Sequence, residues 1–118
     1  MEKSWRIAIA STDGKVINEH FGRADRFYVT DIGTGQPPRC IEIRPVLPLC
    51  HDGDHSLQAL ATTARILQDC QVILVARIGP GARTELEKKG ILVFEYPDFI
   101  CRALENLPEI LERQIAVN

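Results

Sequence analysis

Short apolar runs separated by turn-forming residues dominate the first half of the chain. The run at residues 6–10 is apolar after Arg6 and partly β-branched, and the turn-forming residues 11–14 follow it, so the sequence predicts a buried strand at the centre of a sheet. Two more strand candidates, at 26–32 and 39–46, flank a segment rich in glycine and proline at 33–38. Glycine and proline favour turns and oppose helices. The pair of runs therefore predicts an antiparallel hairpin.

Side chains alternate in the second strand of this hairpin. Ile41 and Ile43 are separated by one residue, and the residues beside them are Cys40, Glu42 and Arg44. Successive side chains of a strand point to opposite faces of the sheet. We therefore expect the two isoleucines to share the buried face of a half-buried strand.

The apolar spacing changes to that of a helix after residue 54. The residues that recur at helical spacing are Leu57, Leu60, Ala61, Ala64 and Leu67. Asp54 stands just before them, and an aspartate at a helix start can accept hydrogen bonds from the first turn. The segment therefore predicts an amphipathic helix with Asp54 as its cap.

Strands and helices alternate in the rest of the chain. Residues 72–76 form a continuous apolar run typical of a parallel strand, and Gly79-Pro-Gly81 introduces a helix after it. Residues 91–95 predict a further parallel strand. A last helix is expected from Asp98, and Pro108 should kink or divide it. The residues expected on its buried face are Ile100, Ala103, Leu104 and Leu107.

This order of elements predicts one α/β domain over residues 1–118. Its sheet is mixed and five-stranded, with an antiparallel hairpin in the amino-terminal half, a parallel carboxy-terminal half and helices on both faces. A chain of 118 residues is long enough for one core and too short for two ordinary domains. Hydrophobic residues make up 45% and charged residues 25%, which is typical of globular proteins.

Charge and hydropathy exclude several classes of partner. The formal net charge is -2, so no long-range field attracts nucleic acid or an anionic membrane. The longest apolar run, at 72–76, is far shorter than the roughly 20 residues that span a bilayer. Residues 1–6 are polar and lack the apolar stretch of a secretory signal. We expect a cytoplasmic protein without nucleic-acid or membrane partners.

Four cysteines are spread along the chain at Cys40, Cys50, Cys70 and Cys101. Their spacing contains no C-x-x-C pair, which excludes a zinc ribbon and a thioredoxin-type motif. In a reducing cytoplasm they are expected to be thiols. Cys70 and Cys101 are expected to be small buried side chains, and Cys40 an exposed one.

The loop after the first strand carries the first candidate binding residues. It opens at the carboxyl end of a central strand, where open α/β sheets bind their ligands. His20 is followed by Phe21 and Gly22. A glycine lets the backbone approach a bulky ligand, and a neutral imidazole can coordinate a metal. The alternative for His20 is a hydrogen-bonded loop histidine.

A second group of candidate ligands lies just before the predicted helix. Cys50, His51, Asp52, Asp54 and His55 place one thiol, two imidazoles and two carboxylates within six residues. These are metal-ligand types, but their spacing matches no closed zinc site. The interpretation is an open or shared metal site. The alternative is that the aspartates cap the helix and the histidines face water.

A third loop follows the strand at 72–76. Gly79 and Gly81 precede a helix whose first N–H groups can hold an anion, and Arg77 and Arg83 add positive charge. The segment lacks the phosphate-loop and dinucleotide motifs. A phosphate- or nucleotide-binding protein is therefore a weaker alternative than a tight turn. No motif of acid/base or nucleophilic catalysis is present, so an enzyme is not expected.

Three segments of the chain resemble one protein family. They are IAIASTDG at 7–14, HFGRA at 20–24 and VARIGPGA at 75–82. In this order they resemble the dinitrogenase iron-molybdenum cofactor biosynthesis family, which includes NifX-like and NafY-like carriers and the carboxy-terminal domain of many NifB proteins. The resemblance covers nearly the whole chain. It implies a ribonuclease H-like fold, here without nuclease activity.

The resemblance also implies a function and a set of site residues. Members of the family bind an iron-sulfur precursor of the nitrogenase cofactor, or the finished iron-molybdenum cofactor, and pass it between donor and acceptor assembly proteins. The family histidine suspected of binding the cluster matches His20. The cofactor-binding residues that we expect are His20, Phe21, Gly22, Arg23, Arg77, Gly79 and Gly81. The metal ligands that we expect are His20, from the family motif, and Cys50, His51 and His55, from their chemistry and position and not from a family motif.

Two further expectations complete this hypothesis. Clusters of this kind are anionic, so the side chains of Arg23, Arg26, Arg77 and Arg83 are expected to hold the cluster if they converge. The chain lacks the closely spaced cysteines of the NifB radical-enzyme domain, so a synthase activity is not expected. The alternative is a regulatory or protein-interaction domain without metal, in which the histidines are incidental.

Overall fold

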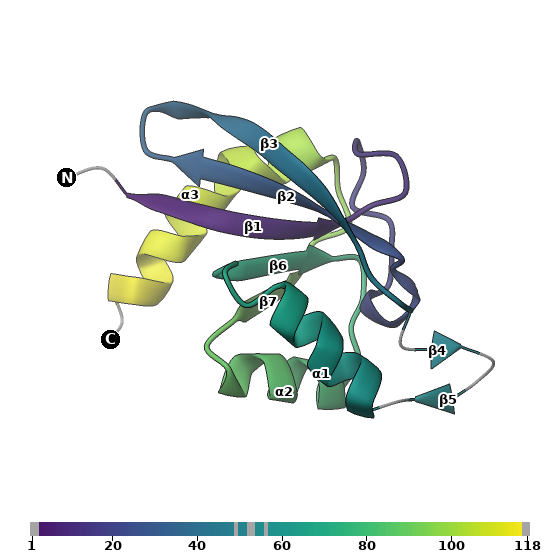
Figure 1. Cartoon of the computed structure of the whole chain (residues 1–118). Helices are drawn as coiled ribbons and strands as arrows, with labels where there is room; N and C mark the ends of the chain where they lie inside the picture. The colour runs from purple at the N-terminus through teal and green to yellow at the C-terminus, as the bar shows by residue number, and fades with distance from the viewer. Residues whose placement is uncertain (1–2, 49, 52–53, 56, 117–118) are drawn as a thin grey trace.

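Five strands form one mixed sheet in the order β3-β2-β1-β6-β7 (Figure 1). The computed structural model describes residues 3–48, 50–51, 54–55 and 57–116. The strands of the sheet are β1 (Ser4–Ala10), β2 (Arg26–Gly33), β3 (Gln36–Pro45), β6 (Val72–Val75) and β7 (Leu92–Glu95). All of the predicted strands are therefore confirmed.

Strand β1 is the centre of the sheet because both of its faces are buried. It pairs antiparallel with β2 and parallel with β6, and β6 pairs parallel with β7. Trp5, Ile7 and Ile9 belong to the core on one face, and Ala8 and Ala10 belong to the core on the other. The carboxyl ends of β1, β6 and β7 consequently meet at one edge of the sheet.

Helices cover both faces of the sheet, as predicted (Figure 1). Helices α1 (Leu57–Ile66) and α2 (Pro80–Lys88) pack on the face of Ala8 and Ala10, and α3 (Ile100–Ala116) packs on the opposite face. The α/β class with a mixed sheet is thus confirmed, and the ribonuclease H-like assignment stays a prediction. No described helix is long and apolar enough to cross a membrane.

Pro108 lies inside α3 and does not divide it. A proline at this position removes the hydrogen bond to the carbonyl of Leu104. Leu104, Leu107 and Leu111 are nevertheless at most 5% exposed. Their burial on both sides of the proline holds one continuous helix, so Pro108 does not divide α3, and the other expected effect, a kink, stays a prediction.

Strand β3 contains a β-bulge, so its two isoleucines do not alternate as predicted. The register between β2 and β3 shifts between Val29 and Thr30, so Glu42 and Cys40 pair with neighbouring residues of β2. Such a bulge inserts one extra residue and reverses the side-chain alternation beyond it. Ile41 consequently packs against the core beneath α1, whereas Ile43 is 53% exposed. The expectation of one shared buried face was wrong.

Other local predictions also fail at element ends. Asp54 lies in a short strand, β5 (Asp54–His55), which pairs with β4 (Cys50–His51), so it is not the cap of α1. Leu57 is the first residue of α1 and is 82% exposed. Cys101 is exposed, although it was expected to be buried. Cys40 is exposed and Cys70 is buried, as expected.

Candidate ligand-binding site

The loop after β1 is held by its own polar side chains. Ser11 is 1% exposed, and its Oγ accepts a hydrogen bond of 2.9 Å from the backbone N–H of Gly14. The Asp13 carboxylate accepts backbone N–H bonds from Lys15 and Val16 at 2.9 and 3.2 Å, and these bonds lower the pKa of Asp13. Gly14 has a φ of 75°, which favours glycine. The loop therefore has a defined shape.

This loop then crosses the carboxyl edge of the parallel strands. The Ile17 N–H donates to the carbonyl of Asp98, and the Ile100 N–H donates to that of Lys15, both at 2.9 Å. Ile17 is 1% exposed and packs in the core beneath α3. The loop after β1 is thereby tied to the loop after β7.

His20 lies where this loop meets the loop after β6. The Ala76 N–H donates to the Glu19 carbonyl at 2.9 Å, and the Phe21 N–H donates to the Arg77 carbonyl at 2.8 Å. His20 and Arg77 form an isolated parallel bridge. The backbone at His20 is therefore fixed on both sides by a neighbouring loop, as expected for the edge at which β1 and β6 end.

Phe21 anchors this segment and leaves His20 outside. The 3-10 helix η1 (Phe21–Arg23) starts at Phe21, which is 2% exposed and packs against Phe27 with 5.9 Å between ring centroids. His20 precedes η1 and is exposed, and its side chain does not cap that helix. The imidazole is thus displayed on a rigid backbone. Gly22 is half-buried and Arg23 is exposed.

The loop after β6 leaves open space at both of its glycines. Gly79 is the N-cap of α2, with an ordinary φ of -71°. A Cβ atom built at Gly79 or at Gly81 has no neighbouring atom within 4 Å. Neither packing nor strain therefore requires glycine here. The first turn of α2 beside this space has N–H groups without intrahelical partners.

Arg83 supports the structure of this loop. Its Nη1 donates to the Val93 carbonyl at 2.7 Å, and its Nη2 lies 4.0 Å from a carboxylate oxygen of Glu95. The other oxygen of Glu95 accepts the backbone N–H of Ile78 at 3.0 Å. Arg83 and Glu95 together brace the loop against β7, so Arg83 does not point freely toward the space beside Gly79.

Only part of the expected cluster of arginines is available for an anion. Arg26 is paired with Asp25 at 3.1 Å, and this pairing raises the pKa of Arg26 and lowers that of Asp25. Arg23 and Arg77 are exposed on the two neighbouring loops, and neither forms an ion pair with a residue whose side chain is described. Among the described side chains, these are the two members of the expected cluster that remain for a ligand.

The second group of candidate ligands lies on a hairpin that sequence analysis did not predict. Strands β4 and β5 are antiparallel, and Cys50 pairs with His55 across them. Strand β4 lies next to η1. The side chains of Cys50, His51 and His55 are outside the described part of the structure, as is Asp52. Among the described residues, no three histidine, cysteine or acidic side chains converge as metal ligands.

The geometry defines an α/β domain in which the loops after parallel strands meet at one edge of the sheet and display an exposed histidine. The chain belongs to the dinitrogenase iron-molybdenum cofactor family, whose model matches residues 3–109. This result confirms the resemblance found in the sequence motifs.

Named relatives of this chain are much longer than it is. The chain is 34% identical over 104 residues to the FeMo cofactor biosynthesis protein NifB of Frankia alni, across 86% of this chain and 20% of that protein. It is 37% identical over 89 residues to NifB of Sinorhizobium fredii, across 75% of this chain and 18% of that protein. The chain thus spans about a fifth of these relatives.

Solved structures share the fold of this chain. The crystal structure of PH0822 superposes with a TM-score of 0.62 at 22% identity, covering 86% of this chain and 87% of that one. A protein of Methanocaldococcus jannaschii superposes with a TM-score of 0.59 at 12% identity, covering 91% and 90%. At these identities the likeness concerns the fold alone.

Proposed function

We propose that this domain binds an anionic iron-sulfur cluster, the iron-molybdenum cofactor or a precursor of it, as cargo during cofactor biosynthesis. It holds this cargo and catalyses no reaction on it. The observation that carries the proposal is His20, an exposed imidazole on a backbone that Ala76 and Arg77 of the neighbouring loop hold on both sides. Membership of the iron-molybdenum cofactor family supports the same conclusion.

Each part of the ligand edge has a chemical role in this proposal. His20 coordinates a metal atom of the cargo through a ring nitrogen. Arg23 and Arg77 offset the negative charge of the cargo through charge-assisted hydrogen bonds. The open space at Gly79 and Gly81 admits a bulky ligand close to the backbone, where the amino end of α2 favours an anion. Phe21 and Gly22 give the turn its shape.

The β4–β5 hairpin supplies a second set of ligands. Cys50 is a soft thiolate donor, and His51 and His55 are imidazole donors, all of which suit iron. The pairing of Cys50 with His55 and the position of β4 beside η1 support an approach of this hairpin to His20. The cargo is then held from two sides.

A carrier of this kind releases its cargo by ligand exchange. The exposed position of His20 leaves room for a ligand from another protein to replace it. The partners in this proposal are the proteins that donate and accept the cluster in cofactor assembly. Neither nucleic acid nor a membrane takes part.

An anaerobic titration tests the proposal. Purified protein is titrated with an iron-sulfur cluster assembled from ferrous iron and sulfide, and bound iron and visible absorbance are followed. Wild-type protein should take up the cluster in stoichiometric amounts, and His20→Ala should lose most of it. The control Lys15→Ala changes an exposed residue of the same loop and should behave like wild type.

The alternatives make different predictions in the same experiment. A protein-interaction domain takes up no iron in any variant. A phosphate- or nucleotide-binding domain is stabilised against heat by nucleotides and not by clusters. Equal uptake by wild type and His20→Ala removes His20 from the proposal.

A further inference from the structure

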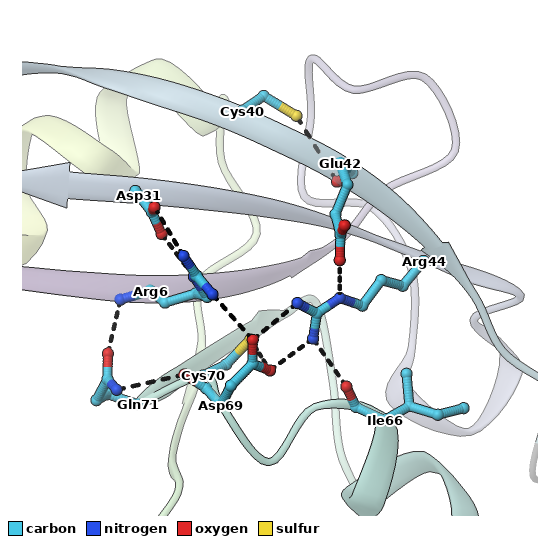
Figure 2. A network of polar contacts seen from close by, with 9 residues as sticks. All are labelled: Arg6, Asp31, Cys40, Glu42, Arg44, Ile66, Asp69, Cys70 and Gln71. Carbon is cyan, nitrogen blue, oxygen red and sulfur yellow. Dashed lines mark hydrogen bonds and ion pairs between the residues drawn. The ribbon is translucent and has the colours of Figure 1, made fainter.

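A network of ion pairs joins β1, β2 and β3 to the turn after α1 (Figure 2). Its centre is Asp69, which lies between α1 and β6. Two arginines from different strands donate to the Asp69 carboxylate, namely Arg44 of β3 and Arg6 of β1. Asp31 of β2 accepts from Arg6 in turn, at 2.8 and 3.1 Å.

Arg44 makes the closest contacts of this network. Its Nη1 and Nη2 donate to the two oxygens of Asp69 at 2.6 and 2.8 Å, a two-pronged geometry that fixes orientation as well as distance. Its Nη1 also donates to the Ile66 carbonyl at 2.8 Å, one of the carbonyls that the end of α1 leaves without an intrahelical partner. A third contact, from Nε, goes to Glu42. The Arg44 side chain is only 17% exposed.

These contacts close the base of one excursion of the chain, by which we mean the segment 45–68 between β3 and β6. Arg44 stands near the end of β3 and Asp69 just after α1, so the pair joins the two ends of the segment 45–68. That segment carries β4, β5 and α1, and therefore the Cys50, His51 and His55 of the proposed site.

Burial along α1 shows where the excursion is attached. Its first residue, Leu57, is 82% exposed, whereas the buried residues of α1 are Thr63 and Ala64 near its end. Leu67, just beyond the helix, is fully buried. The excursion is thus attached to the core through α1, where Leu60 and Ile66 also pack, and is closed at its base by the Arg44 contacts.

We propose that Arg44 and Asp69 are positioning residues for the cargo site. By fixing the base of the excursion, they set the approach of the β4–β5 hairpin to His20. This inference rests on the proposed function, because it assigns the pair a role in presenting Cys50, His51 and His55 to the same cluster. The pair itself does not touch the cargo.

The test combines cluster uptake with the chemical protection of one cysteine. Arg44→Gln and Asp69→Asn are compared with wild type and with Asp31→Asn, a control that breaks the Arg6–Asp31 pair and leaves the contacts of Arg44 intact. Each protein is titrated with the ferrous iron and sulfide cluster. Alkylation of Cys50 is then measured by mass spectrometry at equal bound iron.

The expected result is that both test variants bind the cluster roughly tenfold more weakly, the effect typical of residues that orient metal ligands. At equal bound iron, Cys50 should be protected in wild type and Asp31→Asn and reactive in Arg44→Gln and Asp69→Asn. If Arg44 and Asp69 only stabilise the fold, the protection of Cys50 from alkylation should depend on the amount of bound iron alone. Circular dichroism checks that the variants are folded. If Arg44→Gln does not fold, Asp69→Asn still tests the inference, because it keeps the contact of Arg44 with the Ile66 carbonyl.

Two results would overturn this inference. If Arg44→Gln and Asp69→Asn match wild type in affinity and in Cys50 protection, the pair has no positioning role and the proposed carrier function is unaffected. If wild type binds no cluster, the carrier function fails and the inference fails with it.

Discussion

The anchoring role of Phe21 predicts a large loss of stability when its ring is removed. Phe21 is 2% exposed and packs against Phe27 with an interplanar angle of 51°. Replacing a buried phenylalanine with alanine costs about 3–5 kcal/mol, because apolar contacts are lost and a cavity remains. The short turn of η1 can partly close over that cavity. We therefore expect Phe21→Ala to lower the free energy of unfolding by about 3 kcal/mol.

Urea denaturation of Phe21→Ala measures this loss as a lower midpoint with an unchanged slope. The matched control is Phe99→Ala, because Phe99 is 53% exposed and its ring contact is with Arg102, at 5.7 Å from guanidinium carbon to ring centroid. An exposed contact of this kind contributes roughly 0.5–1 kcal/mol. If Phe21→Ala loses no more stability than Phe99→Ala, the ring does not anchor the turn that displays His20.

Three further predictions follow from side-chain environments. Burial and the neighbouring Asp69 raise the pKa of Cys70 to about 12, so a thiol reagent at pH 7 should label Cys40 and Cys101 and should label Cys70 only after denaturant is added, as mass spectrometry would show. Hydrogen bonds from two arginines lower the pKa of Asp69, so its stabilising effect is present above about pH 4 and is lost as the pH falls through the lowered pKa. Asp69→Asn should accordingly be less stable than wild type at pH 7. Denaturation series at decreasing pH should show that the difference in free energy of unfolding between the two proteins becomes smaller in acid. Gly79→Ala should leave the melting temperature nearly unchanged, since the added Cβ meets no atom within 4 Å, yet it should weaken cluster uptake; normal uptake would show that the ligand does not approach this backbone.

Sequence periodicity predicted the strands and the edge that carries His20, because these features depend on local patterns. Alternating Ile7 and Ile9 with Ala8 and Ala10 places β1 at the centre of the sheet. The carboxyl ends of parallel strands share one edge, so the meeting of His20 with the loop of Arg77 follows from the order of elements.

Other features depend on contacts that periodicity does not describe. The bulge at Ile41 is a mismatch between two strands, and either strand alone reads as regular. The contact between Arg44 and Asp69 joins residues 25 positions apart and depends on how α1 docks. Cys101 is different, because its exposure was predictable: the buried positions of α3 include Ala103 and Leu107, and residue 101 lies off that helical face.

Coordination of the cargo by His20 is the central claim, and nitrogen hyperfine spectroscopy tests it most directly. The protein is loaded anaerobically with the iron and sulfide cluster, brought to a paramagnetic oxidation state with a redox mediator, and prepared with ordinary and with ¹⁵N-labelled histidine. The account predicts histidine nitrogen couplings that change with the label, and one of these couplings should be missing in His20→Ala. A loaded wild-type protein without any histidine coupling, or a set of couplings that is the same in His20→Ala as in wild type, would contradict it.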